Sequence, residues 1–271
     1  MKYYYPEQSQ RYQEVERTWS EIHSNYPDGF DQFSSRPFLE QVLPDLEWKV
    51  ERPRAFDLGG GTGPGACFLA ELGIRVDAVD LIPAAIDVAR KIAAERDLDV
   101  HYEVMEITQM PLSGTQYDLI VDSYWIQHIV MDRDRKAVFA AVRTRLKPSG
   151  YYLVSNSIYN ATRHHPEEVV VDSTSGKVYH TYDEICLFDS TTEIYYEPFS
   201  EANDAPEDYE GSTLMAGTWY LPTRRYRTAQ SLVAELESEG IAVLLQTGEY
   251  GENLLCQLPP SSPFRERKGG G

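Results

Sequence analysis

A glycine-rich turn between an apolar run and a helical pattern is the part of the sequence best suited to binding a ligand. Residues 55–64 read AFDLGGGTGP. Glycine permits positive φ and lets a ligand approach the backbone closely. The N–H groups at the start of the following helix have no intrahelical partners and point toward the turn. We therefore predict a nucleotide-type site at the end of the first strand.

Two kinds of nucleotide fit the spacing of these glycines. Gly61 and Gly63 begin a G-x-G-x-x-A match to the dinucleotide fingerprint, and Asp80 follows about twenty residues later, as that fingerprint requires. The same stretch also fits an acid-x-Gly-x-Gly-x-Gly pattern that begins at Asp57 and continues through Gly59. A glycine turn alone does not decide between these nucleotides, nor between a ligand site and a structural loop.

Acidic residues end three of the strands that we expect. They are Asp57, Asp80 and Glu106. Ligands of doubly wound sheets bind at the carboxyl ends of the strands. An acid after the second strand can accept from both ribose hydroxyls, and an acid after the third can accept from the exocyclic amine of adenine. One acid after a strand is usually a turn former, but three in register predict a nucleoside.

The elements that must position these residues alternate between apolar strands and amphipathic helices, which implies a parallel sheet. We expect strands at 54–58, 74–79, 100–105, 117–121 and 151–155, and helices at 36–43, 64–72, from 83 onward and at 132–146. Residues 147–150 are expected to turn the chain into the fifth strand. The predicted fold class is α/β, with a doubly wound and mostly parallel sheet.

Five short segments together resemble the class I S-adenosylmethionine-dependent methyltransferases of the small-molecule type, over about residues 50–156. They are DLGGGTG at 57–63, VD at 79–80, EI before MP at 106–111, YDLI at 117–120 and LKPSG at 146–150. The last is similar to the family's L-K-P-G-G, which a nicotinamide dehydrogenase has no reason to carry. Glu106 stands where the family more often has Asp, and Ser149 replaces a glycine of the turn.

The resemblance implies a Rossmann-like methyltransferase fold that binds S-adenosyl-L-methionine. A hairpin at 241–246 and 254–258 would supply an antiparallel seventh strand. Methyl transfer needs alignment, exclusion of water and removal of a proton, so a large catalytic apparatus is not expected. The residues implied to bind the cofactor are Asp57, Gly59, Gly61, Gly63, Asp80, Leu81, Glu106, Ile107, Asp122 and Ser123.

The segment after the fourth strand is expected to face the acceptor. Family members often carry a histidine near the position of His128, and its usual pKa range suits proton removal at neutral pH. We therefore expect His128 to be the general base, although a histidine packed against a backbone carbonyl fits the sequence as well. Tyr124 and Trp125 are expected to line the acceptor pocket, or else to belong to the core.

A basic cluster at 220–227 interrupts an acidic chain. Its Arg224 and Arg225 are expected to hold a substrate carboxylate through a bidentate contact. Equally, they could pair with residues 183–210, which contain ten carboxylates and no Lys, Arg or His. That acidic block is either a solvated loop or a lid that attracts a cationic ligand.

We expect residues 1–258 to form a single methyltransferase-like domain. A helical cap would cover 1–45, on the evidence of an apolar stripe from Tyr12 to Tyr26, and Tyr3 to Tyr5 are suited to capping a cofactor. A β-rich insertion at 156–222 would form a substrate lid. Residues 259–271 are expected to be a disordered tail.

The composition limits the partners. Asp and Glu outnumber Lys and Arg by 43 to 25, for a net charge of −18, so nucleic acid and anionic membranes are poor partners. Apolar runs are too short for a membrane span. Three isolated cysteines fit a reducing cytoplasm. No metal is expected, because the pair His164 and His165 is more typical of a surface. The oligomeric state is left open.

Three functions remain open from the sequence. The first is methyl transfer to a nitrogen or oxygen of a small molecule. The second uses S-adenosylmethionine itself as the substrate, by cyclisation or aminocarboxypropyl transfer. The third is a non-catalytic nucleotide-binding module. The products distinguish the first two, because methyl transfer leaves S-adenosylhomocysteine and the second chemistry leaves methylthioadenosine.

Overall fold

The computed structural model describes residues 2–4, 30–159, 169–171, 176–182, 186–199 and 209–259. Three expectations lie wholly or mostly outside these residues: the helical stripe at 12–26, the histidine pair at 164–165 and the C-terminal tail. The acidic block is described only at 186–199 and 209–210.

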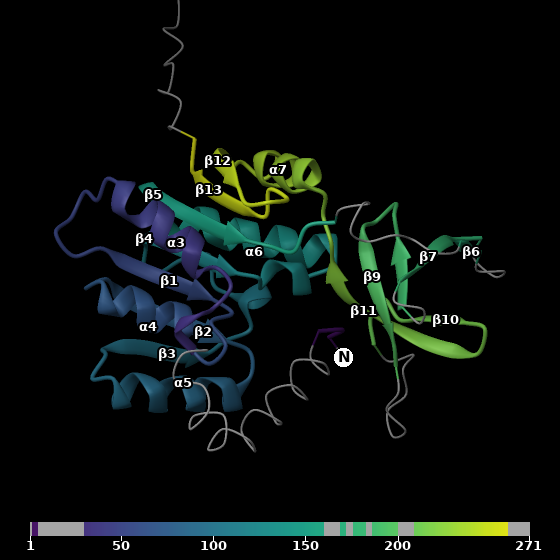
Figure 1. The fold of residues 1–271 in the computed structure, drawn as a ribbon, viewed down its shortest axis with the longest axis horizontal. Helices are drawn as coiled ribbons and strands as arrows, with labels where there is room; N and C mark the ends of the chain where they lie inside the picture. The colour runs from purple at the N-terminus through teal and green to yellow at the C-terminus, as the bar shows by residue number, and fades with distance from the viewer. Residues whose placement is uncertain are drawn as a thin grey trace, which may run out of the picture.

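A seven-stranded sheet forms the centre of the molecule, in the order β12-β13-β5-β4-β1-β2-β3 (Figure 1). The strands are β1 Arg54–Leu58, β2 Arg75–Asp80, β3 Val100–Val104, β4 Tyr117–Ser123, β5 Leu146–Ser155, β12 Ala242–Thr247 and β13 Asn253–Gln257. The first five run parallel, and β13 pairs antiparallel with both β5 and β12. The predicted doubly wound, mostly parallel sheet with an antiparallel hairpin is confirmed.

Helices cover both faces of this sheet. The helices are α3 Arg36–Val42, α4 Pro64–Glu71, α5 Pro83–Glu95, α6 Asp132–Arg145 and α7 Ala229–Ser238. Side chains along each strand alternate between the faces. Ala55 of β1 packs in the apolar cluster with α3, α4 and α5, whereas Phe56 packs in the cluster with α6 and α7. Among the described residues, no helix is both long and apolar enough to span a membrane.

The segment expected to turn at 147–150 is instead part of β5. Tyr117 pairs with Leu146, but Leu119 pairs with Tyr151, so the residues between them form an irregularity within the strand. Lys147 lies here, and its ammonium is 2.9 Å from both carboxylate oxygens of Asp118 on β4. This ion pair holds the irregular segment against the neighbouring strand.

A second, antiparallel sheet is inserted after β5, in the order β10-β11-β9-β8-β7-β6. Its strands are β6 Val169–Val171, β7 Val178–Tyr182, β8 Cys186–Asp189, β9 Ile194–Pro198, β10 Thr213–Met215 and β11 Thr218–Arg225. The insertion was predicted to be rich in β-strands, and its last strand, β11, continues three residues past the predicted end at residue 222. In Figure 1 this sheet lies beside the carboxyl ends of the parallel strands, with β11 nearest to the central sheet.

Candidate active site

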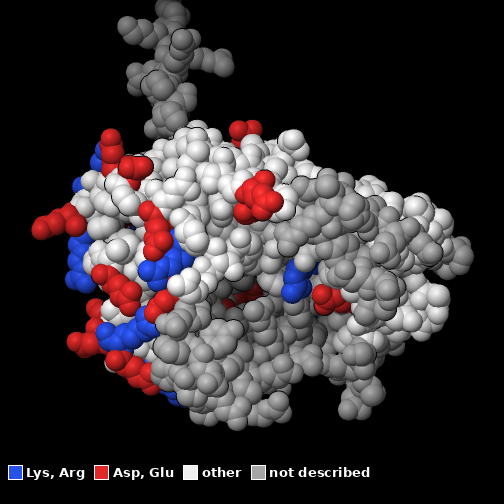
Figure 2. Space-filling model, in the orientation of Figure 1, with Lys and Arg blue, Asp and Glu red and all other residues white. Residues whose placement is uncertain are grey.

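A cavity of about 620 Å³ lies at the carboxyl ends of the parallel strands. The face in Figure 2 is hollowed near its centre, and acidic side chains are visible inside the hollow. The sequence-predicted residues that line this cavity are Asp57, Gly59, Gly61, Asp80, Ser123, Tyr124, Trp125, His128 and Arg224. Residues from the first, second and fourth strands and from the inserted sheet therefore meet in one place.

A smaller cavity of about 30 Å³ adjoins the first. Leu81, Glu106 and Ile107 line it, as does Tyr4 from the N-terminal segment. The residues common to both cavities are Asp80, Trp125 and His128. The residues expected to bind the ribose and adenine of a nucleoside thus lie along one continuous path.

The glycine turn has the backbone conformation that the sequence predicted. Gly59, Gly61 and Gly63 have φ of 64°, 57° and 88°, all in the region that favours glycine. A Cβ at Gly59 would overlap the indole ring of Trp125. Gly63 is not among the cavity residues, because it caps α4 and a Cβ there would meet the hydroxyl of Tyr102. The glycine is thus needed for packing, and its contact with a cofactor stays a prediction.

Asp80 ties the glycine turn to the end of β2. Its carboxylate accepts from the backbone N–H of Gly61 at 3.0 Å and from that of Ile82 at 2.9 Å. Burial raises the pKa of Asp80, although these backbone donors oppose the shift. Each carboxylate oxygen retains capacity to accept a second hydrogen bond, which a ribose hydroxyl can supply.

Asp57 is the least compensated charge in the site. It is 1% exposed, and its Oδ1 has no hydrogen-bond partner among the described residues. Burial raises the pKa of Asp57 to about 7, and the nearby carboxylates of Asp122 and Asp80 add to the effect. A positively charged group in the cavity would offset both causes.

Asp122 is engaged by the turn that follows β4. Its Oδ1 accepts from the N–H groups of Trp125 at 2.9 Å and Ile126 at 3.1 Å, and Tyr152 donates to its Oδ2 at 3.3 Å. Burial raises its pKa to about 6. Asp122 is not among the residues that line the two cavities, and its direct contact with a cofactor stays a prediction. It holds the short turn Ile126–His128 that carries the expected base.

Glu106 is already engaged by a residue from the start of the chain. Its Oε2 accepts from the hydroxyl of Tyr4 at 2.6 Å, and its Oε1 accepts from the hydroxyl of Thr108 at 2.7 Å. The neighbouring Tyr3 fixes this segment, because its hydroxyl oxygen accepts from the N–H of Val130 at 3.0 Å. The N-terminal residues thus form a wall of the small cavity, where a tyrosine was expected to cap a cofactor.

The turn with His128 contains a cavity residue that the sequence analysis missed. Gln127 is buried, lines the large cavity and accepts from the N–H of Ser157 at 2.8 Å. Ser157 also lines the cavity, just after β5. The signal was present, since polar residues that follow parallel strands reach the ligand edge.

Tyr124 occupies the cavity wall with a strained backbone. Its φ is 59°, which is uncommon for an aromatic residue, and its N–H donates to the carbonyl of Ser155 at 2.7 Å. Backbone strain of this kind is concentrated at functional sites. The strain at Tyr124 has a structural cause, because β4 ends here and the chain must reverse into the turn that bears Trp125 and His128.

The two arginines of β11 have different surroundings. Arg224 lines the large cavity. Arg225 is 6% exposed, donates to the carbonyl of Val130 at 2.9 Å and forms an ion pair with Asp132 at the start of α6. Successive residues of a strand point to opposite faces, so only one of the pair reaches the cavity. The assignment of Arg225 to substrate binding is therefore corrected.

A profile of a protein family described as "Methyltransferase domain" matches residues 55–150. A ubiquinone biosynthesis O-methyltransferase from Xanthomonas oryzae pv. oryzae is 30% identical over 103 residues, which cover 38% of this chain and 42% of the relative. One of the same name from Methylocella silvestris is 32% identical over 99 residues, covering 35% and 39%. The chain thus matches less than half the length of these curated relatives.

Solved structures share the fold over most of the chain. An S-adenosylmethionine-dependent methyltransferase from Clostridium acetobutylicum has a TM-score of 0.56 at 15% identity and covers 91% of this chain and 98% of its own. The glycopeptide N-methyltransferase MtfA complexed with S-adenosyl-L-methionine has a TM-score of 0.53 at 21% identity, covering 86% and 96%. The strand order and these likenesses agree: the predicted fold is confirmed as that of the class I methyltransferases, and residues 55–150 match the methyltransferase-domain profile.

Proposed function

We propose that the protein is an S-adenosylmethionine-dependent methyltransferase that acts on a nitrogen or oxygen of a small acceptor bearing an acidic group. The observation that carries the proposal is a single cavity that joins the glycine turn, the unpaired Oδ1 of Asp57 and the side chain of His128. The glycine turn and the Asp57 carboxylate suit a cationic nucleoside, and His128 suits proton removal.

The residues at the carboxyl ends of β1, β2 and β3 fit this cofactor. S-adenosylmethionine would supply a methyl group already activated by a sulfonium, and it carries an ammonium as well. Asp57 is buried and forms no ion pair within the described part of the chain, so a cation nearby would stabilise its ionised form. Asp80 is placed for the ribose hydroxyls, and Glu106 with Ile107 for the adenine. The glycine turn lets the backbone approach the methionine part.

The acceptor would occupy the part of the large cavity nearer the inserted sheet, with this insertion acting as its lid. His128 would remove the proton of the acceptor, while Tyr124 and Ser157 border the same space. An acidic acceptor is repelled by a protein of net charge −18, so it needs a local cation. Arg224 provides one on the cavity wall and favours a carboxylate or a similar planar anion.

The wider setting follows from the same chemistry. We infer a cytoplasmic enzyme of small-molecule metabolism, with neither nucleic acid nor membrane as partner. The acidic surface supports this, because phosphate groups would be repelled.

The first test is binding followed by product analysis. Calorimetry should show S-adenosylmethionine binding, and incubation with small amines and phenols, each with and without a carboxylate, should yield a methylated acceptor and S-adenosylhomocysteine. Release of methylthioadenosine instead would assign the protein to the chemistry in which the cofactor is consumed. No binding in calorimetry would reject the proposal.

The second test concerns the base. Replacement of His128 with Asn should lower turnover by about 10²–10⁴, the usual contribution of positioned acid–base catalysis. Cofactor affinity should change little, because the loss falls on the transition state. His101→Asn is a matched control, since that side chain is 70% exposed on β3. A loss below about tenfold for His128→Asn would assign His128 to packing.

A further inference from the structure

One buried guanidinium holds the turn that carries His128. Arg135 of α6 is 1% exposed, and its Nη1 donates to the carbonyls of Ile126 at 2.7 Å and Ile129 at 2.8 Å. These two carbonyls bracket Gln127 and His128 in the sequence. Any movement of Arg135 therefore moves the part of the backbone that presents both side chains to the cavity.

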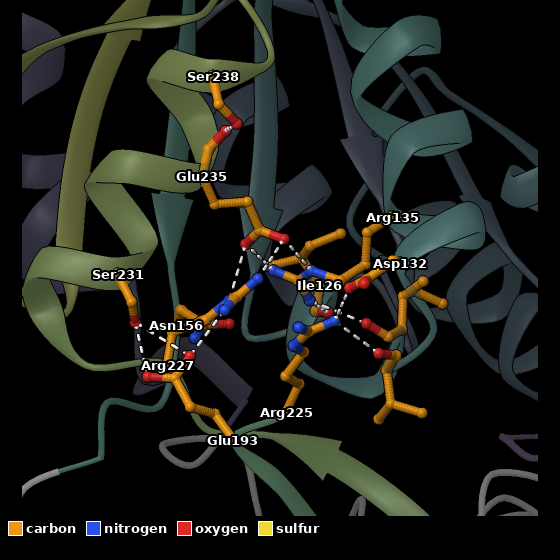
Figure 3. A network of polar contacts seen from close by, with 12 residues as sticks. Ile126, Asp132, Arg135, Asn156, Glu193, Arg225, Arg227, Ser231, Glu235 and Ser238 are labelled. Carbon is orange, nitrogen blue, oxygen red and sulfur yellow. Dashed lines mark hydrogen bonds and ion pairs between the residues drawn. The ribbon is translucent and has the colours of Figure 1, made fainter. Parts of the chain in front are cut away.

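The guanidinium of Arg135 is bound to a carboxylate that a second arginine also binds. Glu235 of α7 accepts from Nε and Nη2 of Arg135, each at 2.6 Å, and also from Nη2 of Arg227 at 3.0 Å (Figure 3). Burial alone would raise the pKa of Glu235, but the two guanidinium groups lower it to about 2. Glu235 is thus fully ionised at neutral pH, and two arginines divide its hydrogen-bonding capacity.

Arg227 connects this carboxylate to the inserted sheet. Its Nη1 donates to Glu193 at 2.7 Å, and Glu193 lies between β8 and β9. The hydroxyl of Ser231, in the first turn of α7, donates to the same carboxylate at 2.8 Å. Figure 3 shows these side chains converging from the inserted sheet and α7 toward Arg135.

The backbone of Glu193 is unusual for this residue type. Its φ is 59°, in the left-handed region that glycine and asparagine favour. Such a conformation is strained and persists only where surrounding contacts hold it. Here Arg227, Ser231 and the N–H of Thr228 provide these contacts. The insertion is therefore fixed to the start of α7 through one strained acidic residue.

We propose that Glu193 is a positioning residue, which sets the place of the His128 turn through Arg227, Glu235 and Arg135. When Glu193 loses its charge, Arg227 loses one of two carboxylate partners and binds Glu235 more strongly. Arg135 is then held less firmly to Glu235, and its contacts with the turn shift. The proposal rests on the proposed function in one respect, the assignment of His128 as the base.

The primary test reads the position of the turn directly and needs neither cofactor nor acceptor. Glu193→Gln keeps the size of the side chain and removes its charge. We expect the imidazole NMR resonances of His128, assigned by their loss in His128→Asn, to move by more than their line width. The emission of Trp125, which begins the same turn, should change as well.

The matched control is Glu210→Gln. Glu210 also links the inserted region to α6, through an ion pair with Arg133, but Arg133 is 62% exposed and its other ion pair is with Asp134, beside it on α6. The His128 resonances should stay within their line width in this variant. An equal shift in both variants would show a general effect of charge and overturn the proposal.

A second variant background tests whether the effect of Glu193 passes through Arg227. In Arg227→Gln the guanidinium that joins Glu193 to Glu235 is absent and only the Ser231 contact remains, so adding Glu193→Gln should move the His128 resonances much less than in the parent background. Persistence of the full shift in this background overturns the proposal, as does its absence in the parent background. If Glu193→Gln does not fold, judged by circular dichroism, Ser231→Ala replaces it and should give a smaller shift of the same kind.

The kinetic consequence separates the two proposals. Once an acceptor is known, Glu193→Gln should lower kcat by about tenfold or less, with cofactor affinity unchanged. Turnover equal to that of the parent would overturn the positioning role. A parent protein that binds no S-adenosylmethionine would reject the proposed function instead. The NMR result would still decide whether Glu193 sets the position of the His128 turn.

Discussion

Replacement of Asp57 by Asn should stabilise the protein and at the same time weaken its site. The Asp57 carboxylate lies at the end of β1, is 1% exposed and has an Oδ1 without a hydrogen-bond partner among the described residues. Its pKa rises from 3.8 to about 7, chiefly through burial and then through Asp122 and Asp80. Asparagine keeps the shape of the side chain but cannot ionise.

The size and sign of the stability effect follow from proton linkage. Between pH 3.8 and about 7 the folded protein holds a proton on Asp57 that the unfolded chain has released. The free energy of unfolding therefore falls as pH rises toward the folded pKa, and the loss is complete above it. About three pKa units at about 1.4 kcal/mol each give a penalty of about 4 kcal/mol at neutral to basic pH.

Denaturant unfolding at two pH values measures this penalty. The Asp57→Asn variant should be more stable than the parent, and its advantage should grow by about 2 kcal/mol from about pH 5.5 to about pH 8. Asp122 and Asp80 are present in both proteins, so their own titrations largely cancel in the comparison. A constant difference across this range, or a variant less stable than the parent at the higher pH, would refute the assignment of a raised pKa.

Cofactor binding should also depend on the protonation of Asp57, but here the ionised carboxylate is the favourable form. If the cation needs ionised Asp57, affinity for S-adenosylmethionine should weaken about tenfold per pH unit below about pH 7. S-adenosylhomocysteine lacks the sulfonium charge and should show a smaller slope. Calorimetry on Asp57→Asn should give weaker binding than the parent above that pH and a nearly flat pH dependence. Parallel curves for parent and variant would show that Asp57 does not face the charged part of the ligand.

Three further perturbations test the site. Asp80→Ala should weaken S-adenosylmethionine binding by roughly 1.5–3 kcal/mol, the scale of hydrogen bonds to a charged group. The control is Asp87→Ala, which changes an exposed carboxylate. Unchanged affinity in calorimetry would reject the contact between Asp80 and the ribose. Gly61→Val should abolish binding, because a side chain on the cavity wall blocks the close approach of a ligand to the backbone and a β-branched residue is strained at φ of 57°. Circular dichroism checks that the fold survives, and retained binding would make the glycine structural. Cofactor binding should change tryptophan emission through Trp125, which lies against Gly59, and Trp125→Phe should remove that change; a signal that survives must come from elsewhere.

The central sheet and the glycine turn were predictable because their signals are local. Apolar runs bounded by glycine and proline indicated where the parallel strands lie in the chain, and acids at the strand ends indicated the ligand edge. Asp57, Asp80 and Glu106 lie along the two adjoining cavities as expected. For these residues the position in the chain determines the position in space, since parallel strands end on the same side.

The remaining site residues depend on which way a side chain points. The sequence grouped Arg224 with Arg225, but only the first lines the cavity. Asp122 and Asp80 both lie at strand ends and both accept from N–H groups of the segment that follows, yet only Asp80 lines the cavity. The link between Tyr4 and Glu106 joins positions far apart in the chain. A single sequence has no signal for that pairing.

The placement of β11 has a consequence for how the protein folds. This strand pairs with β9 in the inserted sheet, and its last residue, Arg225, is bound to Val130 beside α6. Five buried side chains of the inserted strands, those of Tyr179, Leu187, Ile194, Tyr196 and Met215, belong to the same apolar cluster as α6 and α7. The two sheets should therefore unfold in one cooperative transition rather than as separate units. An exchange of insertions between related enzymes would have to include the matching faces of α6 and α7, since neither half can complete this core without the other.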